Sequence, residues 1–268
     1  EDAHVVILGG SFTGMETASI LVNKVAKVTV IEHGVVPFKA FGHAIGERLM
    51  KFFEEKKVEF VTRSDVKECL GDTSGNIHTV VLNDCRQLKA DVLVIGMGST
   101  LNTEFLKDSG LNINPDGSID TNEFLETNIP DVYVGGDIAN SPIHMTGKRE
   151  TIGHYGIAQY HGKIAAINMC GRKEKLQAVP FFWTILFGRT IKYAGHGKAS
   201  DVRIEGSLED MKFVAFYFNE EGRVIALASC GPNPIVAEFA ELLSQGKILT
   251  REEVEKDPFG WSTYKFNE

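Results

Sequence analysis

One stretch near the start of the chain, HVVILGGSFTGMETASIL over residues 4–21, restricts the fold more than any other. An apolar run, a glycine turn and apolar residues at helical spacing follow one another, which predicts a buried strand, a turn and a helix. The turn nearly matches the dinucleotide fingerprint G-x-G-x-x-G. Gly9 is its first glycine and Gly14 its third, but Ser11 replaces the second.

The surroundings of this turn favour a dinucleotide site over a plain strand–helix joint, which is the alternative reading. Gly9 allows the tight turn, Gly14 lets helix and strand approach, and the helix N-terminus faces the phosphates. The next strand, KVTVIE, ends in Glu32, 18 residues after Gly14. A carboxylate there can accept hydrogen bonds from the adenosine-ribose hydroxyls and repels a 2′-phosphate, so NAD(H) is favoured over NADP(H). With its extra Cβ and hydroxyl, Ser11 must displace the pyrophosphate or hydrogen-bond it, and we expect a working but weakened site.

Strand and helix patterns alternate through the first part of the chain. A helix over residues 46–57 and a strand over residues 58–62 add a second crossover, which predicts a parallel sheet with right-handed connections. A small antiparallel meander should follow, before ADVLVIG returns as a buried strand. The remaining elements expected are a helix continuing to about residue 24, a strand over residues 132–137, a helix over residues 155–169, strands within 212–219 and 223–229, and a helix over residues 234–245.

Composition excludes several classes of protein. The chain has 268 residues, 43% of them hydrophobic, and a net charge of −8, which argues against nucleic-acid binding. No apolar run approaches the roughly 18 residues of a membrane span, and no signal peptide is visible. The four cysteines are far apart and form no CxxC pair, so we interpret them as reduced intracellular thiols.

Two further glycine phrases are candidates for ligand contact. VIGMGS places Gly96 and Gly98 at the carboxyl end of a returning strand, where ligands bind in doubly wound sheets; a simple strand-ending turn is the alternative. TNIPDVYVGGD delivers Gly136 and then Asp137, a carboxylate that could reach a sugar-like hydroxyl or cap a helix. The histidines lack metal-binding spacing, so no metal is expected. No G-x-S-x-G motif is present.

Together these phrases resemble the flavin-dependent NADH:ferredoxin and rubredoxin reductases, the family that includes the apoptosis-inducing factors. The likeness covers essentially the whole chain and looks closest to the apoptosis-inducing factor 3-like branch, which carries a Rieske domain upstream. It is carried by GGSFTGMETA, FFEEKKVEF, ADVLVIGMGSTLNTEFLKDSGL, TNIPDVYVGGD, PFFWTILFGRTIKYAG and KFVAFYF.

The resemblance implies an α/β fold of the glutathione reductase type in three parts. Residues 1–115 would form a Rossmann NAD(H)-binding domain with a β-meander. Residues 116–176 would form the C-terminal part of a second, Rossmann-like FAD domain, and residues 177–268 an α+β C-terminal domain. In this family hydride passes from NADH to FAD, and electrons then leave to an iron–sulfur or similar acceptor.

Site residues follow by position in the matching phrases. Phe12 matches an aromatic residue near the flavin and nicotinamide rings and Glu16 an acid near the nicotinamide, so these two are the expected catalytic residues. The expected NAD(H) site comprises Gly9, Gly10, Ser11, Phe12, Thr13, Gly14, Glu16, Glu32, Gly96 and Gly98. The expected FAD site comprises Gly136, Asp137, His154, Tyr155 and Trp183, with Asp137 at the ribityl–phosphate region and His154 and Trp183 beside the isoalloxazine.

The chain departs from the family pattern in ways that bear on FAD. Gly153 stands where some relatives place an acid beside the flavin. The family opens with an FAD-binding half that this sequence does not contain, so we expect a fragment that binds NAD(H) but holds FAD poorly.

Two other functions fit the same scaffold. A disulfide or coenzyme A-disulfide reductase would need a reactive cysteine, usually in the half that precedes this one. A redox-controlled pro-apoptotic signalling protein would use the cofactor as a conformational ligand. The expected partners are NADH and an electron-acceptor protein or Rieske-type domain, and a homodimer is a possible assembly. The resemblance implies a mitochondrial location, with the cytoplasm as the alternative.

Overall fold

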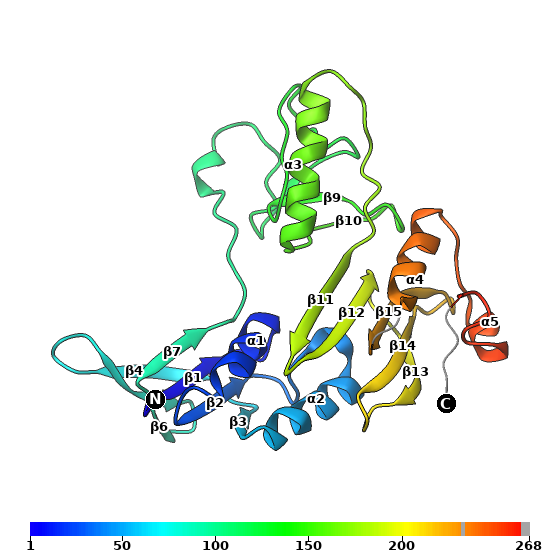
Figure 1. Ribbon diagram of the computed structural model, residues 1–268. Coiled ribbons are helices and arrows are strands. Elements are labelled where there is room, and N and C mark those ends of the chain that lie inside the picture. Colours follow the sequence, from blue (N-terminus) through cyan, green and yellow to red (C-terminus); the bar gives the residue numbers. More distant parts are fainter. Residues whose placement is uncertain (232–233, 264–268) are drawn as a thin grey trace.

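A four-stranded parallel sheet forms the first part of the molecule (Figure 1). The structure is a computed structural model that describes residues 1–231 and 234–263. The strand order is β3-β2-β1-β7, and neighbouring strands run parallel, as the repeated crossovers predict. The sheet and its crossover helices comprise β1 (His4–Leu8), α1 (Phe12–Leu21), β2 (Lys27–Glu32), α2 (His43–Glu55), β3 (Val58–Thr62) and β7 (Val92–Ile95), with the short 3₁₀ helix η1 (Lys39–Phe41) before α2.

Alternate residues of β1 face two different hydrophobic clusters, because successive strand side chains point to opposite faces. Val5 and Ile7 join a cluster with the inner sides of α1 and α2. Val6 and Leu8 pack with Val80 and other side chains of a three-stranded antiparallel sheet. That sheet is the predicted meander and consists of β4 (Val66–Gly71), β5 (Ile77–Leu82) and β6 (Gln87–Lys89).

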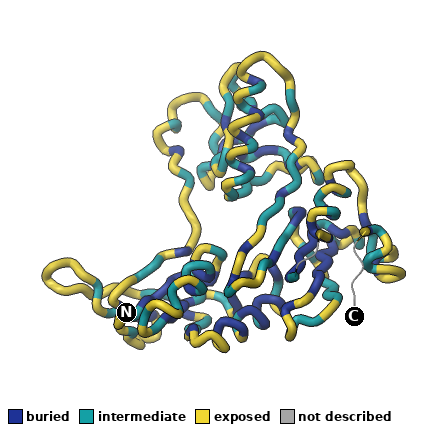
Figure 2. The backbone as a smooth tube through the Cα atoms, viewed as in Figure 1, coloured by how far each residue is buried: buried dark blue, intermediate teal, exposed yellow. Residues whose placement is uncertain are grey.

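The chain then leaves β7 through an exposed segment and enters a second unit (Figures 1 and 2). A separate hydrophobic cluster holds this unit together, with Ile119, Val134 and Ile164 at its centre. Its elements are η2 (Glu104–Leu106), β8 (Ile119–Asp120), β9 (Ala139–Pro142), β10 (Arg149–Glu150) and α3 (Tyr155–Met169). The helix predicted over residues 155–169 is confirmed.

Three element predictions are wrong. The strand expected to return as a buried one, β7, lies at the edge of the sheet, and its Val92 and Ile95 are exposed. Residues 132–137 are not a strand: Tyr133 makes one isolated bridge, to Glu126, and Gly136 turns the chain with a φ of 81°. A strand needs a neighbouring backbone in register, and the described residues supply only that bridge at this position. Helix α1 also ends at Leu21, where a turn from Lys24 N–H to Leu21 O (2.7 Å) replaces the expected last helical turn.

A five-stranded antiparallel sheet of order β11-β12-β15-β14-β13 forms the last part of the chain. One face of this sheet packs against α4, with Phe216 and Phe239 in the contact. The opposite face joins the cluster of α1 and α2 through Phe213 and Ala228. The elements are β11 (Phe181–Leu186), β12 (Arg189–Gly195), β13 (Asp201–Ser207), β14 (Lys212–Phe218), β15 (Val224–Cys230), α4 (Ile235–Ser244) and α5 (Arg251–Lys256).

No helix within residues 1–231 and 234–263 combines the length and the apolar character that a membrane crossing requires.

Candidate functional site

The glycines of the first turn are required by close backbone packing. Gly9 has a φ of 104°, and a Cβ built on it would lie 2.5 Å from Gly96 O. A Cβ on Gly14 would overlap with Gly9 O. The turn therefore brings α1 against both β1 and the end of β7, which places the start of α1 at the carboxyl edge of the sheet.

The N-terminus of α1 points its free donors at this edge. Met15 N–H donates to Ser11 O at 3.0 Å. The N–H groups before it, on Phe12, Thr13 and Gly14, lie in the first turn, where an α-helix offers them no internal acceptor. Such donors, together with the helix dipole, suit a phosphate.

Ser11 makes a contact that the sequence did not predict, since we expected it either to displace the pyrophosphate or to hydrogen-bond it. Its hydroxyl donates to Gly96 O at 2.7 Å and so ties the glycine turn to the end of β7. Ser11 is the N-cap residue of α1, yet its side chain makes no capping bond. Because the hydroxyl hydrogen is directed to Gly96, it is not directed at a phosphate in this conformation.

Glu32 is held in place by two backbone donors. Gly10 N–H donates to Glu32 Oε2 and Gly34 N–H donates to Glu32 Oε1, each at 2.7 Å. A Cβ on Gly10 would lie 2.5 Å from Glu32 Oε2 and 3.0 Å from Pro37 Cβ, so a side chain there would displace the carboxylate and press on Pro37. A carboxylate has about four lone-pair sites. Two of them therefore stay available to ribose hydroxyls on a side chain that is already oriented.

Phe12 lines an aromatic cavity of about 280 Å³ where the three parts of the chain meet. Its ring packs edge-on against Phe182, with the ring centroids 5.0 Å apart, and Phe182 stacks on Tyr193 at 4.9 Å. His154 also lines this cavity, so the structure brings together two residues predicted for different cofactors. Burial raises the pKa of Tyr193 to about 12, so its phenol remains protonated at neutral pH.

The loop around Gly136 and Asp137 lies against α3. Gly136 N–H donates to His161 Nδ1 at 3.3 Å, and burial lowers the pKa of His161. A Cβ on Gly153 would lie 3.7 Å from Asp137 Oδ2. Asp137 is not a helix cap: the N-cap of α3 is His154, whose Nδ1 accepts from Gly156 N–H at 3.2 Å. Among the described residues, the Asp137 carboxylate has no hydrogen-bond partner.

Trp183 and Tyr155 lie apart from the cavity lining, with 51% and 64% of their surface exposed. Strand alternation explains Trp183, because Phe182 and Thr184 occupy the opposite face of β11. Thr184 is buried, and its hydroxyl donates to Glu16 Oε1 at 2.6 Å. Glu16, one of the two expected catalytic residues, is therefore held by the last part of the chain.

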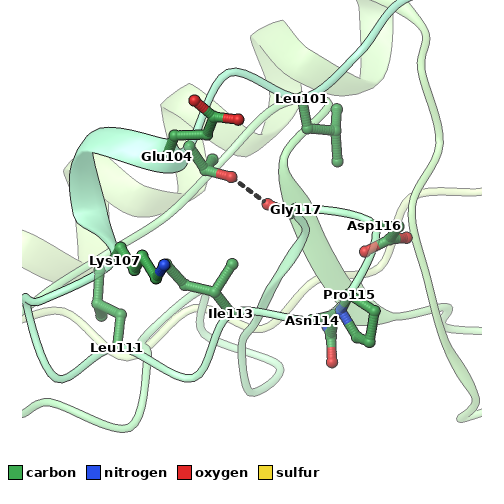
Figure 3. Close-up of a pocket in the computed structure, with 10 residues that line it drawn as sticks. Leu101, Glu104, Lys107, Leu111, Ile113, Asn114, Pro115, Asp116 and Gly117 are labelled. Carbon is green, nitrogen blue, oxygen red and sulfur yellow. Dashed lines mark hydrogen bonds between the residues drawn. The ribbon is translucent and has the colours of Figure 1, made fainter.

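The other features of the described residues bring no further predicted site residue to the aromatic cavity or the glycine turn. A hollow of about 800 Å³ is formed by residues within 101–117 and contains none of the glycine-turn residues (Figure 3). Thr103 and Gly117 both line this hollow, and Thr103 Oγ1 donates to Gly117 O at 2.7 Å. Gly98 is exposed, with a φ of 93° and open space around it. In the part of the chain that the structure describes, no three or more His, Cys, Asp or Glu side chains are grouped to hold a metal ion.

The parallel sheet, its glycine turn and Glu32, held by two backbone N–H groups at the carboxyl edge of the sheet, define a Rossmann-like dinucleotide-binding fold. The sequence pattern of the pyridine nucleotide-disulphide oxidoreductases matches residues 1–162. The chain belongs to this family.

Known relatives agree with this assignment. Apoptosis-inducing factor 3 of Homo sapiens is 39% identical over 255 residues, which are 94% of this chain and 42% of that protein. Ferredoxin--NAD(P)(+) reductase fdr of Sphingomonas sp is 30% identical over 84% of this chain and 54% of its own length. The chain thus spans about two fifths to one half of these relatives.

The fold has a close counterpart among solved structures. The ferredoxin reductase for the CYP199A2 system from Rhodopseudomonas palustris superposes with a TM-score of 0.87 at 22% identity, over 97% of this chain and 64% of that one. This structural likeness supports the expected α/β fold with a Rossmann-like parallel sheet.

Sequence reasoning missed several residues at the site. Thr184 and Tyr193 come from the last part of the chain, and Gly34 was not singled out as a partner of Glu32. Only Thr184 and Phe182 carried a usable signal: alternation along FFWTIL places them on the same face.

Proposed function

We propose that this chain supplies the NADH-binding part of a flavin-dependent oxidoreductase that passes electrons to an iron–sulfur acceptor protein. The observation that carries the proposal is the Glu32 carboxylate, fixed at 2.7 Å by both Gly10 and Gly34 N–H beside the glycine turn. The pyrophosphate would lie on the N–H groups of the first turn of α1. The adenosine ribose would donate its hydroxyls to the free lone pairs of Glu32.

The residues present also fit a flavin at the expected position, though only in part. The cavity beside Phe12 is apolar and aromatic, and Asp137 offers a carboxylate that has no hydrogen-bond partner among the described residues. FAD, when bound, would supply the hydride-accepting ring. Phe12 and His154 would exclude water from one side of that ring, and Glu16, held by Thr184, would orient the nicotinamide.

The acceptor class rests on the relatives, several of which are named ferredoxin reductases. A mitochondrial location is proposed from the likeness to apoptosis-inducing factor 3 alone. Cys230 gives no support to the disulfide reductase alternative, because burial raises its pKa to about 11 and leaves little thiolate at neutral pH.

Glu32→Gln tests the proposal directly. The amide places an NH₂ group opposite one of the two backbone donors and removes the charge that the ribose hydroxyls would bind. We expect NADH affinity to fall about tenfold or more, roughly 1.4 kcal/mol, in a titration that follows nicotinamide fluorescence. NADPH binding should suffer less, because the repulsion of its 2′-phosphate is also removed.

Glu59→Gln is the matched control. Glu59 lies on the adjacent strand β3 and forms an exposed ion pair with Lys27 at 2.8 Å. Its loss should leave NADH affinity unchanged. An unchanged NADH affinity in Glu32→Gln, or an equal loss in Glu59→Gln, would overturn the proposed site.

A further inference from the structure

The loop after β3 is built against the residues that follow Glu32. Arg63 N–H donates to Gly34 O at 2.9 Å, and Ser64 N–H donates to Glu32 O at 3.2 Å. Ser64 is buried, and its hydroxyl lies 3.2 Å from Asn83 Oδ1. The loop is therefore fixed both to the backbone that carries Glu32 and to Asn83.

Asp65 in this loop reaches the residue directly after Glu32. Asp65 Oδ2 lies 2.8 Å from His33 Nδ1, although the His33 side chain is 85% exposed. The backbone carbonyl of Asp65 accepts from Asn83 N–H at 2.9 Å, which fixes the backbone of the loop at this residue. Asp65 thus brings a carboxylate to the ring of His33, the residue that follows Glu32 in the chain.

We propose that Asp65 is a second residue that selects a nicotinamide cofactor without a 2′-phosphate. The inference rests on the proposed NADH site. In Rossmann-like folds the 2′-position lies just past the acid that ends the second strand, and a nearby cation accommodates the phosphate there. Asp65 adds negative charge at this place and keeps His33, the imidazole next to Glu32, engaged. A 2′-phosphate is therefore repelled and gains no ring N–H from Nδ1.

Arg63 is the competing group. It lies in the same loop with a left-handed backbone (φ 53°), and it is exposed. If its guanidinium met the 2′-phosphate, the site would accept that group despite Asp65. Binding of the 2′-phosphate by Arg63 would therefore contradict the proposal.

The effect of Asp65 on binding of a 2′-phosphate can be measured without a flavin, with two fragments of the cofactor. Binding of 5′-AMP and of 2′,5′-ADP is measured by calorimetry at neutral pH and low salt, for the wild type, Asp65→Asn and Asp201→Asn. Asp201 is a matched control, because it is an exposed aspartate paired with Arg251 at 2.9 Å in the last sheet. We expect Asp65→Asn to tighten 2′,5′-ADP about fivefold while 5′-AMP stays unchanged, and the gain should shrink as salt screens the charge.

The outcomes separate the two proposals. A wild type that binds neither fragment overturns the proposed dinucleotide site itself. A wild type that binds 5′-AMP, with the same preference over 2′,5′-ADP in Asp65→Asn, overturns the role of Asp65 alone. Wild-type binding of 2′,5′-ADP as tight as that of 5′-AMP also overturns it, and loss of that binding in Arg63→Ala would assign the phosphate to Arg63.

Discussion

Ser11 occupies the middle of the glycine turn, where the fingerprint has a residue without a side chain. Its hydroxyl is satisfied by Gly96 O at 2.7 Å, so it stabilises the protein rather than presenting a donor to a ligand. Its Cβ still stands in the turn that would cradle the pyrophosphate. The weakened site therefore remains our prediction, and the structure supplies a reason for a serine to be there.

Ser11→Gly should separate stability from binding. We expect NADH to bind about threefold more tightly, roughly 0.6 kcal/mol, because the Cβ is gone. We expect the free energy of unfolding in urea to fall by about 1 kcal/mol, because the bond to Gly96 is lost. Ser11→Ala keeps the Cβ and loses the bond, so it should be destabilised without the gain in affinity. Weaker NADH binding by Ser11→Gly would show instead that the hydroxyl contributes to the site.

His161 should make stability depend on pH. Burial lowers its pKa below the usual value of 6.5, so the folded protein keeps it neutral while the unfolded chain takes up a proton. The contribution of neutral His161 to the free energy of unfolding is fully present above pH 6.5. It is lost as the pH falls toward the folded-state pKa, at up to about 1.4 kcal/mol per pH unit. His161→Gln, which can still accept from Gly136 N–H, should flatten the decrease in unfolding free energy between pH 7 and 5. His144→Gln, at an exposed position, should leave the wild-type slope.

At the scale of elements, glycine has opposite effects on stability in α1 and α3. Gly14 allows α1 to touch the backbone of the preceding turn, whereas a Cβ on Gly162 of α3 would meet no atom within 4 Å apart from the nearby backbone of its own helix. The same residue type is thus a packing requirement in one helix and only an entropic cost in the other.

Alanine at these two positions should have opposite effects in urea denaturation. Gly14→Ala should lower the free energy of unfolding by at least about 2 kcal/mol, because helix and turn must separate. Gly162→Ala should raise it by about 0.4–1 kcal/mol, because the unfolded chain loses freedom. Equal stabilities of the two variants would show that the close approach in α1 relaxes at little cost.

At the scale of the whole molecule, the first and last parts of the chain share a hydrophobic cluster. The hydrogen bond from Thr184 to Glu16 lies in the same contact, where β11 meets α1, and it joins residues 168 positions apart. The middle unit has its own cluster and meets the others around the aromatic cavity. The cavity therefore depends on how all three parts dock.

Thr184→Val should weaken this docking. It leaves the half-buried Glu16 carboxylate without its donor, which costs about 1–3 kcal/mol of unfolding free energy. Thr184→Ser restores the hydroxyl and should recover most of the loss. A serine variant as unstable as the valine variant would assign the effect to the lost methyl packing instead.

The sequence by itself determined the parallel sheet, its glycine turn, the acid at the end of β2 and the helix of residues 155–169. These features depend on local periodicity and on spacings of fewer than twenty residues, which a short chain segment dictates through its own backbone sterics. Only the tertiary structure decided that Ser11 bonds Gly96, that Thr184 holds Glu16, that Asp65 reaches His33 and that residues 132–137 form no strand. Each of these depends on which distant backbone or side chain arrives next to the residue, and packing of the whole chain settles that.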